Sequence, residues 1–470
     1  MVAHPIEREY ADALGLWGWI CLVARAVALS EDPAFGPIAS FFLALKVVKA
    51  AVGGKARRHG QTVYKYTALE GMRDYQYGLS AVRIQNLLPS TKWLARRFAR
   101  RNKLPFALIH LSNGTTAAVL GPKAEAERTE RTAETAKGAK EPQRAKKATG
   151  ANTANPANTA STASTPAQAS SSAPRRAVVV FHGGGYMAPA LSKHIHLACG
   201  FSKTLPDNVA VYILQYGLAS ETANQYPRQL QQAAVLLDYL LTAENYPPSA
   251  ITLVGDSAGG HLALSLLLHL AHPDPQVPAV TLPGGARLAG AALLSPWMIT
   301  RARSEGLVRA NEAKDVLYAA ALDAWAQNFL GGPVDESEKS ENRDKADAAA
   351  ADKGSPWSCP LTMPDQWLAD LPVDDLFVTY GEDEVLAGNI ARFCTALCRA
   401  RKPVPGVKTA AKGYANELHV HMVMNRFLML GETCLSEEEF KAWYATQLEA
   451  PLRPPPPPPS SHDAVEAAGR

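Results

Sequence analysis

Ser257 has the surroundings of a catalytic nucleophile. It lies in Gly255-Asp-Ser-Ala-Gly259, after the apolar run 251–254 and before the helical pattern 261–268. A sharp strand-to-helix turn crowds its central residue, so the positions two before and two after it must lack a side chain, as these two glycines do. Such a turn holds a hydroxyl out at the carboxyl end of a strand, where it can attack a substrate. For this segment taken alone, the alternatives are a plain glycine-rich turn or a phosphate-binding loop.

A second glycine-rich segment, His182-Gly-Gly-Gly-Tyr186, follows the apolar run 177–181. Successive glycines let backbone N–H groups approach a ligand closely, which suits the stabilisation of a developing negative charge. A phosphate loop is the rival interpretation, but such a loop usually recruits a following Gly-Lys-Ser/Thr, which is absent here. The segment therefore favours an oxyanion hole.

A serine hydroxyl is a poor nucleophile at neutral pH, so it needs an imidazole to take its proton and a buried carboxylate to orient that imidazole. Two histidines near the end of the chain, His419 and His421, are candidates for the base. Three consecutive acids follow the expected strand 375–380: Glu382, Asp383 and Glu384. All the residue types of a serine-based acyl-transfer site are thus present.

The elements that must position these residues alternate between strands and helices. The expected strands are 104–111, 115–120, 177–181, 208–215, 251–255, 288–297, 375–380 and 407–411, and the expected helices are 226–241, 261–268, 304–330, 389–401 and 436–448. The first two strands should form a hairpin, because Asn113-Gly114 tolerates the positive φ angles of a tight turn. The later alternation predicts a parallel sheet with right-handed crossovers and a ligand site at the strand carboxyl ends.

Composition restricts the class of protein. With 470 residues, 47% hydrophobic and 20% charged, the chain can bury a large core. The net charge of +4 is too small to drive nucleic-acid binding, so no nucleic-acid partner is expected. The six cysteines form no Cys-x-x-Cys pair and no His or carboxylate ligands cluster at zinc-finger spacing, so no metal site is expected.

Three segments lack the residues needed for a core. The segment 121–174 contains no Val, Ile, Leu, Met, Phe, Trp, Tyr or Cys that could be buried in a core, which predicts a disordered insertion. The charged, Ala-rich segment 331–355 should be a mobile loop, and 451–470 a Pro-rich disordered tail. We accordingly expect an N-terminal region at 1–103 and a catalytic domain at 104–450.

The N-terminal region has two apolar stretches near membrane length, 13–29 and 34–52. Each carries cations, Arg25 in the first and Lys46 and Lys49 in the second, so a membrane span, an interfacial helix and a cap helix all remain open. We expect membrane association, with the endoplasmic reticulum as a candidate, and otherwise a cytoplasmic location.

The segment 87–103 is a basic amphipathic helix that could contact an anionic membrane or pack its apolar face on the domain. The N-terminal hundred residues and the helices of 304–330 are expected to form a cap.

Taken together, His-Gly-Gly-Gly at 182–185, Gly-Asp-Ser-Ala-Gly at 255–259 and Gly-Glu-Asp-Glu-Val-Leu at 381–386 resemble the hormone-sensitive-lipase-like branch of the α/β-hydrolase superfamily. The pattern looks most like fungal steryl acetyl hydrolase-type proteins. It covers about 104–120 and 175–450 of this chain. The resemblance implies an α/β-hydrolase fold, with a mostly parallel central sheet flanked by helices, a helical cap and disordered insertions.

By the same resemblance, Ser257 matches the nucleophile, Asp383 the acid and His419 the base. The oxyanion hole would be formed by the backbone N–H groups of Gly183, Gly184 and Ala258. The chain departs from the family in having Asp-Glu-Val where Asp-Pro-Leu is frequent, and Val420 after the histidine in place of Gly or Asp.

The implied function is that of a serine carboxylic-ester hydrolase that works through an acyl-enzyme on a small-molecule or lipid ester, such as a lipid or sterol acetate. No metal or organic cofactor is needed for this chemistry. The alternatives are an acyltransferase that uses the same triad, and a catalytically inactive hydrolase fold that serves as a membrane-bound binding protein. The sequence does not define an oligomeric state.

Overall fold

The computed structural model describes residues 61–78, 85, 88–122, 174–298, 306–331 and 355–452. The two N-terminal apolar stretches lie outside these residues, as do nearly all of the predicted insertion, loop and tail. The domain boundaries and the disorder predicted there stay predictions.

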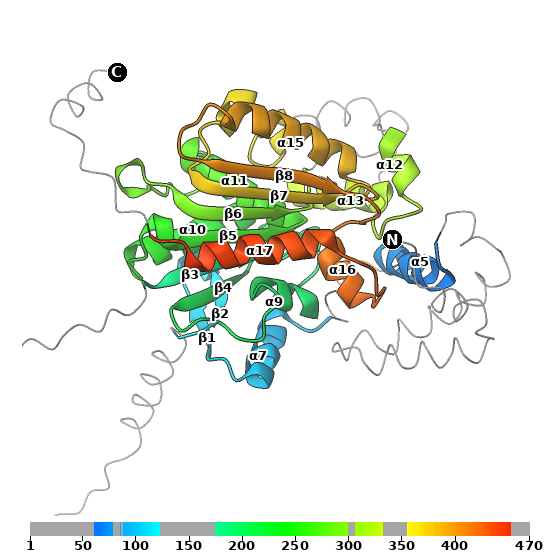
Figure 1. The fold of residues 1–470 in the computed structure, drawn as a ribbon, viewed down its shortest axis with the longest axis horizontal. Coiled ribbons are helices and arrows are strands. Elements are labelled where there is room, and N and C mark those ends of the chain that lie inside the picture. The colour runs from blue at the N-terminus through cyan, green and yellow to red at the C-terminus, as the bar shows by residue number, and fades with distance from the viewer. Residues whose placement is uncertain are drawn as a thin grey trace, which may run out of the picture.

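An eight-stranded sheet in the order β1-β2-β4-β3-β5-β6-β7-β8 forms the centre of the molecule (Figure 1). Its strands are β1 (Phe106–His110), β2 (Thr116–Leu120), β3 (Arg176–Phe181), β4 (Val209–Gln215), β5 (Ile251–Asp256), β6 (Leu288–Leu294), β7 (Val373–Gly381) and β8 (Lys408–Tyr414). The pairs β1/β2 and β2/β4 are antiparallel and all others are parallel. The predicted mostly parallel sheet is confirmed.

The chain order places a switch point beside β3. From β3 the chain crosses to β4 on one side, and then returns to form β5 on the other side. The carboxyl ends of β3 and β5 are therefore neighbours, and open α/β sheets bind ligands at such a point. The glycine loop after β3 and Ser257 after β5 both lie there.

Helices cover both faces of the sheet. They are α5 (Val63–Gly78), α7 (Thr91–Asn102), α9 (Ser192–Ala198), α10 (Arg228–Thr242), α11 (Ala258–Ala271), α12 (Gly306–Asn311), α13 (Ala319–Leu330), α15 (Ala387–Arg401), α16 (His421–Phe427) and α17 (Leu435–Glu449). In β3, Val179 packs in the cluster that contains residues of α10, α11 and α15, whereas Val178 and Val180 pack in the cluster that contains residues of α7, α9 and α17. This two-sided burial explains the continuous apolar run of the strand.

Two local predictions can be compared with the structure. The turn between β1 and β2 has positive φ at Asn113 (59°) and Gly114 (63°), as the predicted hairpin requires. The sequence predicts a helical region throughout 304–330, but the structure has two helices there, α12 and α13, separated by a loop at 312–318. This loop contains Asp315, which is fully buried.

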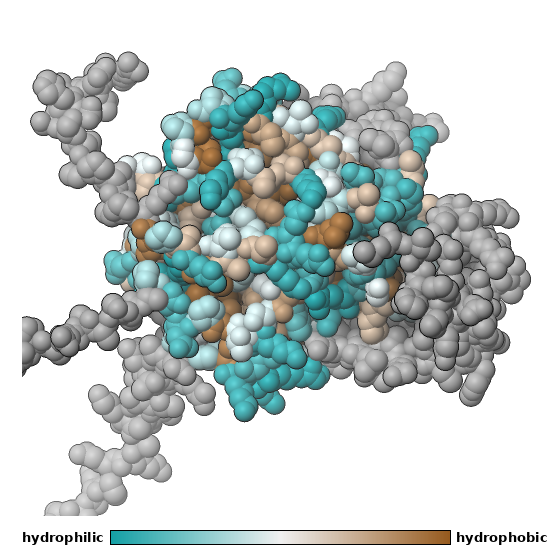
Figure 2. Space-filling view, in the orientation of Figure 1, coloured by the Kyte–Doolittle hydropathy of each residue, from teal (hydrophilic) through white to brown (hydrophobic). Residues whose placement is uncertain are grey.

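Helix α7 shows how the apolar face of the predicted helix 87–103 packs. Its apolar side chains, among them Leu94 and Phe98, are buried in the core cluster on one side of the sheet. Its outward surface is hydrophilic in the lower part of Figure 2, and Trp93 is 39% exposed. The apolar face thus packs on the domain. None of the described helices is both long and apolar enough to cross a membrane.

Candidate active site

Ser257 occupies the sharp turn between β5 and α11. Its backbone has φ 52° and ψ −118°, an unusual conformation for a residue other than glycine. A β-carbon at Gly255 would overlap the carbonyl group of Gly259, and one at Gly259 would overlap the carbonyl group of Phe181. The two glycines are therefore required by close backbone contacts, for the reason that the sequence pattern indicates.

Gly259→Ala is expected to destabilise the fold by about 3 kcal/mol, at the upper end of overpacking effects, because the added methyl group meets backbone that cannot rotate away. Gly285→Ala is the control, since a β-carbon there has nothing within 4 Å and only its positive φ opposes the change. Denaturant unfolding of both variants measures the difference. Equal stability of the two would contradict a close backbone contact at Gly259.

His419 lies beside Ser257, as the sequence predicts. Its Nε2 is 2.8 Å from Ser257 Oγ, and its Nδ1 is 3.3 Å from Glu384 Oε2. His419 and Glu384 are both buried. One ring nitrogen can thus accept the serine proton while the carboxylate holds the other nitrogen in its protonated form.

The acid position differs from the predicted one. Asp383 points outward, where its Oδ1 lies 2.7 Å from Nζ of Lys314, and Glu382 is exposed. Glu384 is fully buried and faces His419. The prediction of Asp383 beside the histidine is therefore corrected to Glu384, because the turn after β7 directs only the third of these three acids inward.

The rival histidine, His421, faces another direction. Its Nδ1 lies 3.5 Å from the Leu418 nitrogen and its Nε2 lies 3.8 Å from Glu432 Oε2. Burial lowers the pKa of His421 to about 4. This imidazole is therefore neutral, and it belongs to the first residue of α16.

The glycine loop also differs from the prediction in one residue. The N–H of Gly183 donates to Asp256 Oδ1 at 3.1 Å, so it is not free for an oxyanion, and its assignment to the oxyanion hole is corrected. The other carboxylate oxygen of Asp256 lies 3.1 Å from His194 Nε2. Gly184 and Gly185 follow with φ of 118° and 60°. Asp256 therefore ties the glycine loop to the strand that carries Ser257.

Helix α13 covers the glycine loop. A β-carbon at Gly185 would overlap the ring of Trp325, so this indole lies directly against the loop. One turn further on, Phe329 stacks on Tyr186 with ring centres 4.4 Å apart. The site is thus bordered by aromatic side chains, as suits an apolar substrate group.

The charges around His419 determine how it should titrate. Burial disfavours the imidazolium, but the hydrogen bond and charge of Glu384, with the charges of Asp315 and Asp256, outweigh burial and raise the pKa of His419 above 6.5.

Among the described residues, no cluster of three or more His, Cys, Asp and Glu side chains could hold a metal ion.

A serine–histidine site of this kind should lose hydrolytic activity as the pH decreases, with a midpoint above 6.5, because only the neutral imidazole can accept the serine proton. Above that midpoint His419 is neutral and the rate should reach a plateau. A kcat/KM profile on a neutral ester measures this limb. A rate that stays constant from pH 8 to well below 6.5 would contradict the raised pKa.

A family model described as steryl acetyl hydrolase matches residues 158–423, more than half of the 470 residues. The chain belongs to the steryl acetyl hydrolase family. The matched segment includes the glycine loop, the Ser257 turn, the three acids and both histidines. The predicted resemblance is confirmed, and so is the α/β-hydrolase fold.

Curated relatives agree with this membership. Protein mug81 of Schizosaccharomyces pombe, which carries the family's name, is 25% identical over 221 residues, 45% of this chain and 52% of its own. An acetyl-hydrolase of Streptomyces hygroscopicus is 26% identical over 157 residues, 33% of this chain and 48% of its own. The present chain thus spans about half the length of the curated relatives it matches.

Solved structures are similar at lower identity. A mutant of the esterase E40 aligns with 82% of this chain and 99% of its own, with 19% identity and a TM-score of 0.49. An esterase from the bacterial hormone-sensitive lipase family aligns with 82% and 98%, with 18% identity and a TM-score of 0.46.

Two residues of the site are not assigned by the sequence pattern. Glu384 is one of the three candidate acids, but the family pattern favours Asp383 when Asp383-Glu-Val is aligned with the family's Asp-Pro-Leu. If Leu386 is instead aligned with the family's leucine, Glu384 takes the position of the acid. Asp315 lies in the loop between α12 and α13, and no motif surrounds it. Only the fold brings it to His419.

Proposed function

We propose that this member of the steryl acetyl hydrolase family is a serine carboxylic-ester hydrolase that forms an acyl-enzyme. Ser257 would be the nucleophile, His419 the general base and acid, and Glu384 the carboxylate that orients His419. The observation that carries this proposal is the 2.8 Å distance from Ser257 Oγ to His419 Nε2, with Glu384 on the opposite side of the ring.

In the first half-reaction, Ser257 Oγ attacks the ester carbonyl carbon while its proton passes to His419 Nε2. The tetrahedral intermediate collapses, the C–O bond to the alcohol breaks, and His419 returns the proton to the leaving alkoxide. In the second half-reaction, water attacks the acyl-enzyme with His419 again as the base. The carboxylic acid leaves and Ser257 regains its proton.

The oxyanion of each intermediate needs preorganised N–H donors, each worth about 3 kcal/mol by analogy with measured cases. Of the predicted set, Gly184 and Ala258 are retained, and Ala258 begins α11, where the first N–H groups have no partner within the helix. The N–H of Gly183 is bound by Asp256, so it is left out of this set.

An acetyl ester of a lipid or sterol alcohol is the proposed substrate. Support comes from the family description and from the aromatic side chains of α13 over the glycine loop. A panel of p-nitrophenyl esters from acetate to decanoate, together with cholesteryl acetate, tests it. We expect the highest kcat/KM for acetyl esters, and no turnover of any ester would overturn the proposed function.

Membrane association is also proposed, and it rests on the apolar stretches 13–29 and 34–52 with the cations that follow them. Fractionation of the full chain and of a chain that begins at Arg57 tests it. The full chain should sediment with membranes, at the endoplasmic reticulum, and the shorter chain should not. A full chain that stays in the supernatant, with loss of activity on truncation, would instead assign these stretches to the cap.

A further inference from the structure

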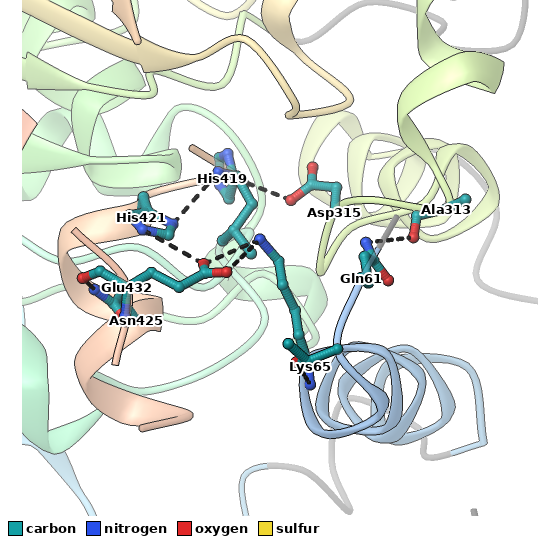
Figure 3. A network of polar contacts seen from close by, with 10 residues as sticks. Gln61, Lys65, Ala313, Asp315, His419, His421, Asn425 and Glu432 are labelled. Atoms are coloured by element: carbon teal, nitrogen blue, oxygen red, sulfur yellow. Dashed lines mark hydrogen bonds and ion pairs between the residues drawn. The ribbon is translucent and has the colours of Figure 1, made fainter. Parts of the chain in front are cut away.

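Asp315 is a second buried carboxylate beside His419. It lies in the loop between α12 and α13 with none of its surface exposed. Its Oδ1 accepts from the backbone N–H groups of Val316 at 2.7 Å and His419 at 3.0 Å, and its Oδ2 accepts from that of Val385 at 2.8 Å. Figure 3 shows this carboxylate directed at His419.

Two of these three N–H groups belong to the loops that carry the proposed acid and base. Val385 directly follows Glu384 in the loop after β7, and His419 lies in the loop after β8. Near the ends of β7 and β8 the two loops are joined directly, where the Asp383 N–H donates to the Glu417 carbonyl oxygen at 3.0 Å. Asp315 adds a second link, at Val385 and at His419 itself, and thereby helps to fix where the Glu384 carboxylate meets the His419 ring.

The burial of Asp315 is not explained by packing alone. Burial and the charge of Glu384 raise the pKa of this carboxyl, while the charge of His419 and the backbone N–H groups of Val385 and His419 lower it, and the net result is a pKa of about 6. Burying two acids against one imidazole is costly unless the imidazole becomes cationic or the N–H groups compensate. The N–H groups compensate in the structure, and the imidazole becomes cationic during the proposed reaction.

Helix α5 holds the Asp315 loop from its other side. Arg73 Nε and a terminal guanidinium nitrogen donate to the carbonyl oxygen of Asp315 at 3.0 and 2.7 Å, and Gln76 Nε2 donates to that of Val316 at 3.1 Å. Near the start of the helix, Gln61 Nε2 donates to Ala313 O at 3.2 Å, and Lys65 pairs with Glu432 at 3.0 Å (Figure 3).

We propose that Asp315 is a positioning residue for the hydrolytic reaction: it clamps the Glu384 loop to the His419 loop, and α5 holds the clamp in place through Arg73. The inference rests on the proposed function. It assigns to the N-terminal helix an indirect part in catalysis, because α5 fixes the loop on which acid and base depend.

Asp315→Asn tests the clamp. The amide keeps the volume but offers one acceptor oxygen, so at least one of the three N–H groups then faces an NH₂ donor. We expect kcat to fall by about 10²-fold, as a small misplacement of reacting groups can cause, with KM little changed. The acid limb of kcat/KM should also move to lower pH. The substitution removes the Asp315 charge, which raises the pKa of His419, and leaves only the charges of Glu384 and Asp256.

Glu312→Gln is the matched control, since Glu312 lies in the same loop but accepts from the Ala319 N–H of α13 at 3.0 Å, a bond that involves neither the Glu384 loop nor the His419 loop. It should leave kcat and the acid limb unchanged. All rates are normalised to serines that react with a fluorophosphonate, so misfolded protein does not count. If Asp315→Asn retains kcat within about threefold and the same acid limb, the positioning role is wrong.

Arg73→Gln decides the matter if Asp315→Asn fails to fold. It removes the guanidinium donors to the Asp315 carbonyl and leaves the carboxylate, so kcat should fall by about threefold or more at constant KM. An unchanged kcat overturns the inference. A wild-type protein that neither turns over esters nor reacts with a fluorophosphonate would overturn the proposed function itself, and this outcome is distinct from an active enzyme indifferent to Asp315.

Discussion

Ser257→Ala is expected to lower kcat/KM for ester hydrolysis by at least about 10⁴-fold, because it removes the hydroxyl of the proposed nucleophile. The change removes one oxygen from a side chain that is 9% exposed and leaves the turn conformation to the same glycines. The unfolding midpoint should therefore stay close to that of the wild type. Initial rates on an acetyl ester, with unfolding curves of both proteins, measure the two quantities.

Ser265→Ala is the control for this variant. It removes a hydroxyl from α11, the helix that follows the Ser257 turn, where Ser265 Oγ lies 2.9 Å from the carbonyl oxygen of His261 and 2.6 Å from that of Trp357 and can donate to either. This variant should lose some stability and keep its turnover. Activity of Ser257→Ala within about tenfold of wild type would contradict the assignment of the nucleophile.

Glu384→Gln should lower kcat by about 10⁴-fold, by analogy with the loss caused by an amide at the acid of a serine triad. The amide keeps the shape of the side chain but can no longer hold the charge that stabilises the His419 imidazolium. Asp383→Asn is the matched variant one residue earlier and should stay within about threefold, because an ion pair as exposed as that of Asp383 with Lys314 contributes little. Steady-state kinetics of both variants on one ester measure the contrast. The reverse order of effects would return the acid to Asp383.

The parts of the site that follow from the sequence are those fixed by short local geometry. Ser257 needs two glycines within two residues of itself, and this requirement is visible in the chain as Gly255 and Gly259. The family pattern favours His419 over His421, and the structure places His419 at the serine. The centre of the sheet could be predicted because β3, β4, β5 and β6 are buried on both faces and appear as continuous apolar runs.

The parts that the sequence does not predict depend on contacts between segments far apart in the chain. Which glycine N–H is free depends on Asp256, which lies 73 residues from Gly183. Which of three consecutive acids turns inward depends on the path of the chain after β7, and Lys314 attracts Asp383 outward from a loop 69 residues away. Asp315 meets His419 across 104 residues. No periodicity or motif encodes such pairings.

Covalent labelling followed by peptide mass spectrometry tests directly whether Ser257 is the nucleophile. The full chain is treated with a fluorophosphonate while hydrolysis of an acetyl ester is followed. We expect a single phosphonyl adduct on Ser257, loss of turnover in proportion to labelling, no adduct in Ser257→Ala, and slow labelling in Glu384→Gln. Ser257 would not be the nucleophile if ester turnover continues after this serine is fully labelled, or if an adduct on another residue abolishes the turnover.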